Sequence, residues 1–480
     1  MRPDFAKVLK LIDEAPLGTT CLRVGDFRVE VVKGETRRIS RVLVANRGEI
    51  AVRVIRACRS LGLESVAAVS EADTDSLAAK LADRAVCIGP ARPADSYLNV
   101  SAIVAAARGA GANALHPGYG FLAEQPRLAQ ACGENGIVFI GPSAQLIEQM
   151  GNKILARQLA AKFGVPVVPG SEKVDSVEEA LRAGETIGFP LLLKAAAGGG
   201  GRGMRVVNEM SELKGAFQAA SSEARAAFGD GTLYVERYIR SARHIEAQIL
   251  ADHFGNVIHL GERDCSLQRR FQKVVEESPA PHLDGLREQI WQAATTLARA
   301  TGYRNAGTIE FIVDQDEDRF YFLEMNTRIQ VEHPVSEMIT GVDIVREQIR
   351  IAAGEPLSVS QDQVRFDGHA IECRINAESP EQGFRPSPGR IRVWKEPGGV
   401  RVDTHCYPGY LVPPYYDSLI AKVIAHAGTR ADALRKMDAA LATFSVEGVD
   451  TTIGFLRSLV NHPDVQNGRT HVRWIENRRL

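Results

Sequence analysis

The segment FLEMNTRIQVEHP, residues 322–334, is dense in groups that bind ions or move protons. Met325, Ile329 and Val331 fall on one side of an extended chain, which is typical of a strand that covers an apolar core. Five polar residues fall on the other side: Glu324, Asn326, Arg328, Gln330 and Glu332. Alternation alone would also fit a solvated strand face, but asparagine is a poor strand former, so we favour a functional site.

Glu324 and Glu332 stand too far apart on an extended chain to share one small ligand. A straight strand of nine residues spans roughly 26 Å between its ends. The segment therefore either serves two neighbouring subsites or folds back after Glu324. Both arrangements place the Arg328 guanidinium between two carboxylates.

A glycine-rich stretch, AAAGGGGRGM, indicates phosphate binding. Backbone N–H groups can close around phosphate oxygens where no Cβ intervenes, as at four consecutive residues: Gly198, Gly199, Gly200 and Gly201. The Walker pattern is absent, and the stretch lies between two strand-like runs, which favours a hairpin lid. A surface loop without function would look similar, but Lys194 on the preceding apolar run can reach phosphates as a point charge.

Two glutamates suggest a metal site beside those phosphates. Glu310 and Glu324 lie on two runs that we expect to pair across a turn at residues 314–318. Paired carboxylates suit Mg²⁺, which takes oxygen ligands and shares them with a nucleotide. Two exposed edge carboxylates are the ordinary alternative, but the nearby lysine and glycines favour nucleotide–Mg²⁺ chemistry.

The other polar clusters carry weaker signals. The charged run at residues 262–277 fits a solvated helix face, although Gln268 and Lys273 could instead face the site. We assign no histidine partner to Cys265 or Cys373, so we expect buried thiols rather than nucleophiles. Five histidines are isolated and lack metal-ligand spacing: His116, His244, His333, His369 and His405.

The elements that position these residues alternate along the chain. From Ser40 on, short apolar runs alternate with amphipathic helical segments, which predicts a doubly wound parallel sheet. HPGYGFLAE, residues 116–124, is a strand-end loop of the kind where such sheets bind ligands. Strand patterns then dominate up to about residue 330, and a smaller mixed region follows.

The bulk composition excludes several classes of protein. The 480 residues predict two to four domains, and a net charge of −1 gives no electrostatic case for nucleic acid or anionic membrane. No apolar run reaches the roughly 20 residues that a membrane helix needs. The start of the chain lacks an apolar signal core, and seven scattered cysteines fit reduced thiols, so we expect a cytoplasmic protein.

The motifs, in their order, resemble those of the biotin carboxylase component of biotin-dependent carboxylases, a branch of the ATP-grasp enzymes. The resemblance covers residues 40–480 and rests on ten motifs: ANRGEIA, HPGYGFL, FIGPS, MGNK, KAAAGGGGRGM, ERDCSLQRR, QKVVEE, EMNTRIQVEHPVSE, ECRINAE and PPYYDSLIAKV.

The resemblance implies a multidomain α/β and α+β chain with three family domains. Residues 39–152 would form the N-terminal doubly wound parallel sheet domain. Residues 153–368 would form the central ATP-grasp domain, with a glycine-rich lid at about 167–240, and residues 369–480 a small mixed C-terminal domain. The implied reaction is phosphorylation of bicarbonate by ATP to carboxyphosphate, which carboxylates N1′ of biotin on a carrier protein.

The resemblance also implies roles for particular residues. The predicted nucleotide contacts are Lys153, Lys194, Gly198, Gly199, Gly200, Gly201, Glu236, Arg237, His244, Gln268, Glu310 and Glu324. The predicted ligands for Mg²⁺ or Mn²⁺, with two ions expected, are Glu310, Glu324 and Asn326. The predicted bicarbonate site is Lys273, Arg328, Gln330, Val331 and Glu332. The predicted biotin pocket is Tyr119, Gly120, Arg328 and Arg374. The predicted catalytic groups are Glu332 as the general base, with Arg328, Lys273 and Arg374.

Two departures from the family pattern bear on function. Phe271 stands where a polar residue, often histidine, precedes the QK pair near the nucleotide, which removes a possible hydrogen bond. The loop at residues 396–405 is shorter than usual, and it lies with Arg53, Arg56 and Arg401 near the family's dimer interface. The family implies a homodimer, and these residues would lie at its interface.

Residues 1–38 lie outside the resemblance. Apolar residues at helical spacing over 5–12 and a hairpin around residues 25–26 predict a helix plus hairpin too small for its own core. This extension weakly resembles the N-terminal segment of some biotin carboxyl carrier proteins, so it would dock on a partner chain or on the enzyme.

The family also implies partners on separate chains. The sequence has no AMKM-type biotinylation site and no carboxyltransferase region, so the chain would work with a biotin carboxyl carrier protein and carboxyltransferase subunits of an acetyl-CoA or related acyl-CoA carboxylase. Two alternatives stay open. Another ATP-grasp ligase would share the lysines, lid and carboxylates but not TRIQVEHPVSE, and a non-catalytic subunit would bind nucleotide without turnover.

Overall fold

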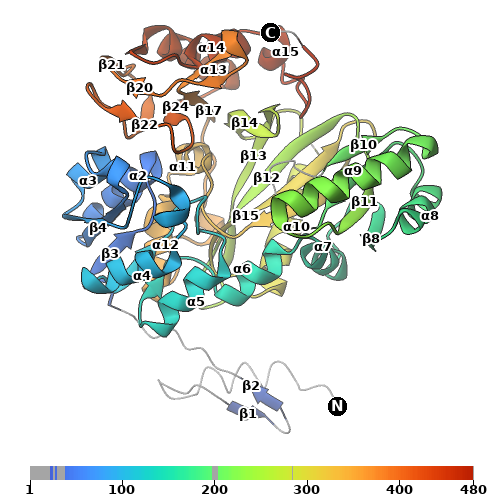
Figure 1. The fold of residues 1–480 in the computed structure, drawn as a ribbon, viewed down its shortest axis with the longest axis horizontal. Helices are drawn as coiled ribbons and strands as arrows, with labels where there is room; N and C mark the ends of the chain where they lie inside the picture. Colours follow the sequence, from blue (N-terminus) through green and yellow to red (C-terminus); the bar gives the residue numbers. More distant parts are fainter. Residues whose placement is uncertain (1–21, 25–26, 30–37, 197–203, 284, 479–480) are drawn as a thin grey trace.

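The computed structural model describes residues 22–24, 27–29, 38–196, 204–283 and 285–478 (Figure 1). The strands β1 (Leu22–Val24) and β2 (Phe27–Val29) pair antiparallel, as expected for the hairpin of the extension. The helix predicted over residues 5–12 lies outside the described residues. Within the described residues, no helix is long and apolar enough to cross a membrane.

The first large unit is the predicted doubly wound sheet. Five parallel strands follow the order β5-β4-β3-β6-β7, with bounds Arg84–Cys87, Glu64–Val69, Arg41–Val44, Ala114–His116 and Val138–Phe139. Along β3, Val42 and Val44 pack in one core cluster and Leu43 in another, so both faces of the sheet are covered. The covering helices are α2 (Gly48–Ser60), α3 (Leu77–Leu81), α4 (Val100–Gly109) and α5 (Pro126–Glu134). Helix α6 (Ala144–Gly151) follows and packs against α5, α7 (Lys153–Lys162) and β16 (Arg319–Asn326).

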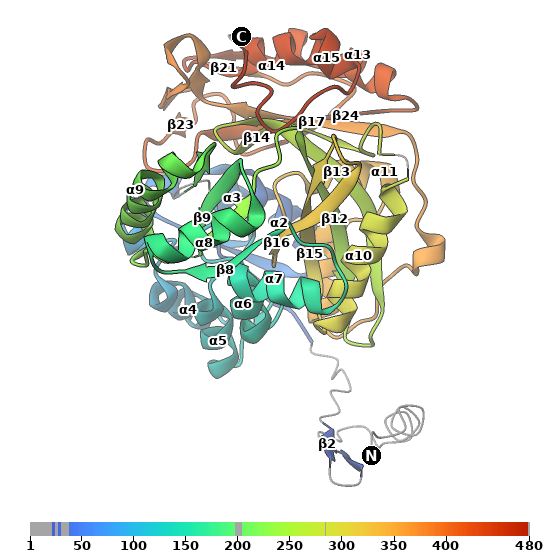
Figure 2. The same ribbon diagram turned by 90° about the vertical axis from the view of Figure 1, so that its right-hand side faces the viewer.

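The second unit carries the predicted lid, and α7 (Lys153–Lys162) precedes it. Its four-stranded sheet has the order β10-β9-β11-β8, with bounds Arg205–Val207, Leu191–Ala195, Leu233–Arg237 and Gly170–Val174. Helices α8 (Val177–Ile187) and α9 (Met210–Phe228) pack against this sheet (Figure 2). Strands β9 and β10 flank the glycine stretch as predicted, while residues 197–203 lie outside the described part.

The third unit is an eight-stranded antiparallel sheet that spans two predicted domains. Its order is β16-β15-β12-β13-β14-β17-β24-β22. The central part supplies β12 (Ala242–Ala251), β13 (Val257–Arg269), β14 (Gln272–Ser278), β15 (Asn305–Asp314) and β16 (Arg319–Asn326). The C-terminal part supplies β17 (His369–Asn376), β22 (Arg401–Thr404) and β24 (Leu419–Ala427). The C-terminal region therefore continues the central sheet instead of forming a separate one.

Helices and short strands complete these two parts. Helix α10 (Arg287–Ala300) packs on β12 and β13, and α11 (His333–Thr340) and α12 (Ile344–Ala352) follow β16. The C-terminal core is closed by α13 (Arg430–Thr443), α14 (Ile453–Val460) and α15 (Pro463–Gln466). Short paired strands lie around it: β18 (Glu378–Ser379), β19 (Arg385–Pro386), β20 (Gly389–Arg390), β21 (Val393–Lys395), β23 (Leu411–Val412) and β25 (Ser445–Glu447).

Two sequence-based expectations need correction. A straight strand through residue 332 is wrong, and the alternative that the segment bends after Glu324 is nearer the structure. Strand β16 ends at Asn326, and the chain turns before α11 begins at His333. Pro334 lies in the first turn of that helix, where its fixed φ is favourable, so the extended pattern cannot continue. Of the two alternatives for residues 262–277, the solvated helix face is wrong, because β13 and β14 form a hairpin there whose turn places Arg270 and Phe271 at positive φ. The other alternative holds, since Gln268 and Lys273 face a cavity.

Candidate active site

A cavity of about 1240 Å³ lies where the three units meet. The loop after β6 lines one side, lid strands β9 and β11 another, and strands of the eight-stranded sheet form the floor. Every predicted site residue in the described part of the chain lines it: Tyr119, Gly120, Lys153, Lys194, Glu236, Arg237, His244, Gln268, Lys273, Glu310, Glu324, Asn326, Arg328, Gln330, Val331, Glu332 and Arg374. Gly198, Gly199, Gly200 and Gly201 lie outside the described residues.

The predicted metal ligands come together at one end of the β15–β16 hairpin. Glu310 and Glu324 are direct cross-strand partners, so their carboxylates project from the same face. Asn326 Nδ2 donates to Glu310 Oε1 at 2.9 Å, and Lys153 Nζ lies 3.2 Å from Glu324 Oε2. This donor set of carboxylate and amide oxygens fits a hard divalent cation.

Lys273 joins three carboxylates at the centre of the cavity. Its Nζ lies 2.6 Å from Glu246, 3.0 Å from Glu310 and 2.6 Å from Glu332. Burial alone would lower the pKa of Lys273, but these three charges outweigh it and raise the pKa well above the usual value. The ammonium therefore stays charged and gathers the three carboxylates.

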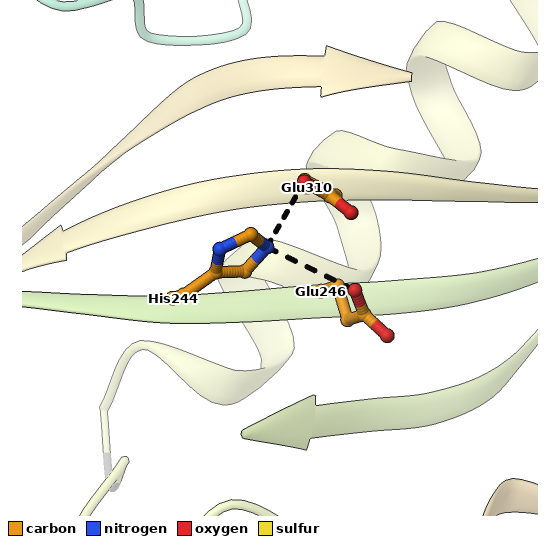
Figure 3. A group of neighbouring side chains, drawn as sticks. All are labelled: His244, Glu246 and Glu310. Atoms are coloured by element: carbon orange, nitrogen blue, oxygen red, sulfur yellow. Dashed lines mark ion pairs between the residues drawn. The ribbon is translucent and has the colours of Figure 1, made fainter. Parts of the chain in front are cut away.

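His244 lies beside this cluster. Figure 3 shows its ring on the strand that also carries Glu246, with Glu310 on the neighbouring strand. Its Nε2 lies 3.0 Å from Glu310 Oε2, and Gln268 Nε2 lies 3.0 Å from its Nδ1. Burial would lower the pKa of His244, yet the Glu310 charge outweighs burial and raises the pKa above its usual value.

Glu332, just before α11, is almost completely buried and held by two cations. Besides Lys273, Arg374 Nη2 lies 2.9 Å from its Oε2. Burial would raise the pKa of Glu332, but the charges of Lys273 and Arg374 lower it far below the usual value. The carboxylate is therefore ionised at neutral pH and able to accept a proton.

The side chain of Arg328 lies between the predicted metal ligands and Glu332. Its Nε donates to Glu124 Oε2 and its Nη2 to Asn326 Oδ1, each at 2.8 Å. Glu124 Oε1 also accepts the backbone N–H of Thr327 at 3.2 Å. The loop after β6 thus fixes both the backbone and the guanidinium of this segment.

The predicted nucleotide contacts lie on the lid side. Lys194 Nζ lies 2.9 Å from Glu236 Oε2, and Arg157 also pairs with Glu236. Burial would lower the pKa of Lys194, but Glu236 raises it, so this lysine stays charged. Arg237 instead pairs with Glu317 at 2.7 Å, so its charge is balanced from the β15–β16 turn.

Several residues of this network escaped the sequence analysis. Glu246 carried a signal, since it follows His244 at strand spacing and must share its face. Glu124, Arg263 and Lys422 lie within motifs quoted above, but nothing local indicated their partners, which lie far away along the chain. Cys265 and Cys373 are buried thiols as expected, and burial raises the pKa of both.

Three family models match consecutive parts of the chain and together cover most of it. They are the biotin carboxylase N-terminal domain over residues 38–147, the carbamoyl-phosphate synthase L chain ATP binding domain over 152–360, and the biotin carboxylase C-terminal domain over 372–477. The chain belongs to the biotin carboxylase family. The predicted family, three-part architecture and enzyme class are thereby confirmed.

Individual relatives agree with this assignment over nearly their whole length. Biotin carboxylase 1 of Bacillus subtilis is 53% identical over 442 residues, which are 91% of this chain and 98% of that protein. The biotin carboxylase structure from Campylobacter jejuni superposes with a TM-score of 0.90 at 48% identity, covering 92% of this chain and 99% of that one.

A further solved relative bears on ligands. The biotin carboxylase domain of the Hydrogenobacter thermophilus 2-oxoglutarate carboxylase is 50% identical, with a TM-score of 0.88, and covers 92% of this chain and 98% of that one. It was solved as a dimer in complex with MgADP, ADP and bicarbonate.

Proposed function

We propose that this chain carboxylates the biotin of a carrier protein, using ATP and bicarbonate through carboxyphosphate. The arrangement that carries the proposal is the pairing of Glu332 with both Lys273 and Arg374. Lys273 also pairs with Glu310, and so connects Glu332 to the predicted metal ligands. A ligase for another substrate would need the carboxylates and lysines on the nucleotide side but not this clamped base.

The nucleotide would bind on the lid side of the cavity. Lys153 and Lys194 would contact its phosphates, while His244 and Gln268 would lie nearer the ribose and base. Glu310, Glu324 and Asn326 would hold Mg²⁺ or Mn²⁺, which supplies charge neutralisation at the phosphates. Lys153 and Lys273 now balance those carboxylates, so we expect both ammonium groups to shift toward phosphate and bicarbonate oxygens in the loaded enzyme.

Bicarbonate would bind among Lys273, Arg328, Gln330 and Val331. Its hydroxyl proton would pass to Glu332, while its oxygen attacks the γ-phosphorus of ATP and ADP leaves. The two cations that keep Glu332 ionised also make it a weak base. The negative charge of bound bicarbonate would raise the pKa of Glu332 toward a useful range.

Biotin would enter beside Tyr119 and Gly120. Carboxyl transfer from carboxyphosphate to N1′ would release phosphate, which would take up the N1′ proton. Arg328 and Arg374 both face this end, and a fixed guanidinium would stabilise the negative charge on the ureido oxygen as that proton leaves. Closure of the lid over residues 167–240 would keep water away from carboxyphosphate.

We propose separate carrier and carboxyltransferase chains as partners, and a homodimer. The solved dimer of the Hydrogenobacter thermophilus domain supports the second suggestion. Within this chain, Arg53 and Arg401 both pair with Glu337, at 2.9 and 2.8 Å, whereas Arg56 is exposed. Arg56 is therefore the member of the predicted interface with most freedom to reach a partner.

The deciding experiment measures ADP release with Mg²⁺-ATP, with and without bicarbonate and free biotin. Turnover should depend on bicarbonate and rise with biotin. Glu332→Gln should reduce it by about 10²- to 10⁴-fold, the usual contribution of a general base, while leaving nucleotide binding intact. The exposed Glu381→Gln on the C-terminal part is the matched control and should behave as the wild type. Equal turnover in Glu332→Gln would rule out the assigned base.

A further inference from the structure

Lys422 on β24 is a buried cation that the proposed roles leave unused. Its side chain is completely shielded from solvent, although an isolated ammonium is costly to bury. It is the cross-strand partner of Arg374, so the two cations project from the same face of the sheet. Burial would lower the pKa of Lys422, but Glu49, Glu372 and Asp403 raise it, so it is charged.

The ammonium of Lys422 contacts the bicarbonate segment directly. Its Nζ donates to the backbone oxygen of Val331 at 2.7 Å. Arg374, one strand away, holds the carboxylate of the next residue, Glu332, at 2.9 Å. Lys422 and Arg374, on neighbouring C-terminal strands, therefore bind two successive residues of the segment at which bicarbonate is proposed to bind.

The same ammonium reaches the biotin end through Glu49. Lys422 Nζ lies 3.1 Å from Glu49 Oε1, and that oxygen also accepts a hydrogen bond from the hydroxyl of Tyr119. Glu49 lies in the first turn of α2 and is nearly completely buried, so its carboxylate has little freedom to find other partners. Lys422, Glu49 and Tyr119 thus connect the C-terminal sheet, the N-terminal unit and the biotin side of the cavity.

We infer that Lys422 is a positioning residue that holds the Val331 carbonyl and, through Glu49, the Tyr119 ring in one fixed arrangement. The inference rests on the proposed function for its kinetic consequence, but not for its structural one. It predicts that the bicarbonate and biotin sides of the site are coupled through a single buried ammonium.

The kinetic test compares Lys422→Met with the exposed Lys395→Met of the same part of the chain. Lys422→Met should lower kcat/KM for bicarbonate by about 10- to 100-fold, the cost of misplacing a reacting group, with the Kd for Mg²⁺-ATP within about twofold. Lys395→Met should change neither value. Bicarbonate kinetics unchanged in Lys422→Met would overturn the inference.

A double-mutant cycle tests the coupling. Tyr119→Phe removes the hydroxyl that donates a hydrogen bond to Glu49. The effect of this change on turnover should be smaller in the Lys422→Met background, where the ion pair that holds Glu49 is already lost. Strictly multiplicative effects of the two changes would refute the connection. Glu49→Gln, a nearly isosteric change, serves if Lys422→Met does not fold and should raise KM for biotin.

Amide hydrogen exchange separates this inference from the proposed reaction. Lys422→Met should accelerate exchange over residues 327–333, with exchange over the lid strand Leu191–Ala195 unchanged, whatever substrate the enzyme uses. A wild type without biotin-dependent turnover would defeat the proposed function, whereas unaltered exchange over residues 327–333 would defeat the positioning role.

Discussion

Arg263 offers a sharp quantitative prediction about the framework under the site. Its guanidinium is fully buried and pairs with the equally buried Glu246. Four further acceptors take its N–H groups at 2.7–3.1 Å: Gln248, Ser336, Thr308 and Gln330. One side chain therefore ties three strands to Gln330, in the segment between β16 and α11, and to the start of α11.

Replacing Arg263 with methionine keeps most of the side-chain volume but leaves the Glu246 carboxylate buried without its Arg263 partner. Breaking a buried ion pair on one side costs about 3–5 kcal/mol, because the remaining charge is uncompensated. Lys273 still contacts Glu246, so we expect the lower half of that range from the charge and about 1 kcal/mol from the lost acceptors. The free energy of unfolding should therefore fall by about 4 kcal/mol.

Urea unfolding followed by tryptophan fluorescence measures this loss. The exposed Arg319→Met is the control and should change the free energy of unfolding by less than about 0.5 kcal/mol. Adding Glu246→Gln to Arg263→Met should recover about 1–2 kcal/mol, because the stranded charge is removed. A loss below about 1 kcal/mol in Arg263→Met, or a double variant no more stable than the single one, would refute the reasoning.

Two further predictions concern pH and the nucleotide. Burial raises the pKa of Glu276 to about 7 against the charge of Arg374, so the native state keeps a proton that the unfolded state loses above about pH 4.5. The free energy of unfolding of the wild type should therefore fall as pH rises toward 7. Measured by urea unfolding, Glu276→Gln should gain up to about 3 kcal/mol of stability relative to the wild type between about pH 5 and 8. A stability difference between the two proteins that stays constant over this range would contradict the reasoning. Phe271→His should lower KM for ATP about 2- to 10-fold by restoring a hydrogen bond. The control is Phe254→His, which changes an exposed phenylalanine outside the cavity and should leave KM unchanged. An unchanged KM in Phe271→His would count against any nucleotide contact at that position.

The local patterns of the sequence predicted the paired strands well. Alternation and the turn residues around 314–318 gave the β15–β16 hairpin, and this fixed Glu310 opposite Glu324 without further information. Apolar runs alternating with helical segments gave the doubly wound sheet for the same reason, because each run must be buried on both faces.

Contacts between distant segments were beyond that reasoning. The polar face of residues 324–332 does line one cavity, yet the strand ends at Asn326, since Pro334 favours a helix start. The partners Glu124 and Arg263 depend on how three units pack, which periodicity does not encode. The same holds for the C-terminal strands, whose pairing with β14 joins segments about 100 residues apart in the chain.

The hydrogen bonds between β14 and β17 join the central and C-terminal strands into one eight-stranded sheet, which forms a stiff frame under the site. Cutting the chain at residue 368 would expose two long unpaired strand edges, so each fragment would present a template for aggregation. Among the described residues, the lid sheet shares no strand ladder with this frame. It contacts the frame through the bridge between Val167 and Phe322 and through side-chain pairs such as Arg237 with Glu317. Movement is therefore expected where the chain joins the lid sheet to this frame, at residues 166–169 and 238–241. Lys273 on β14 and Arg374 on β17 instead lie on one continuous sheet, whose strands cannot slide past one another without breaking hydrogen bonds.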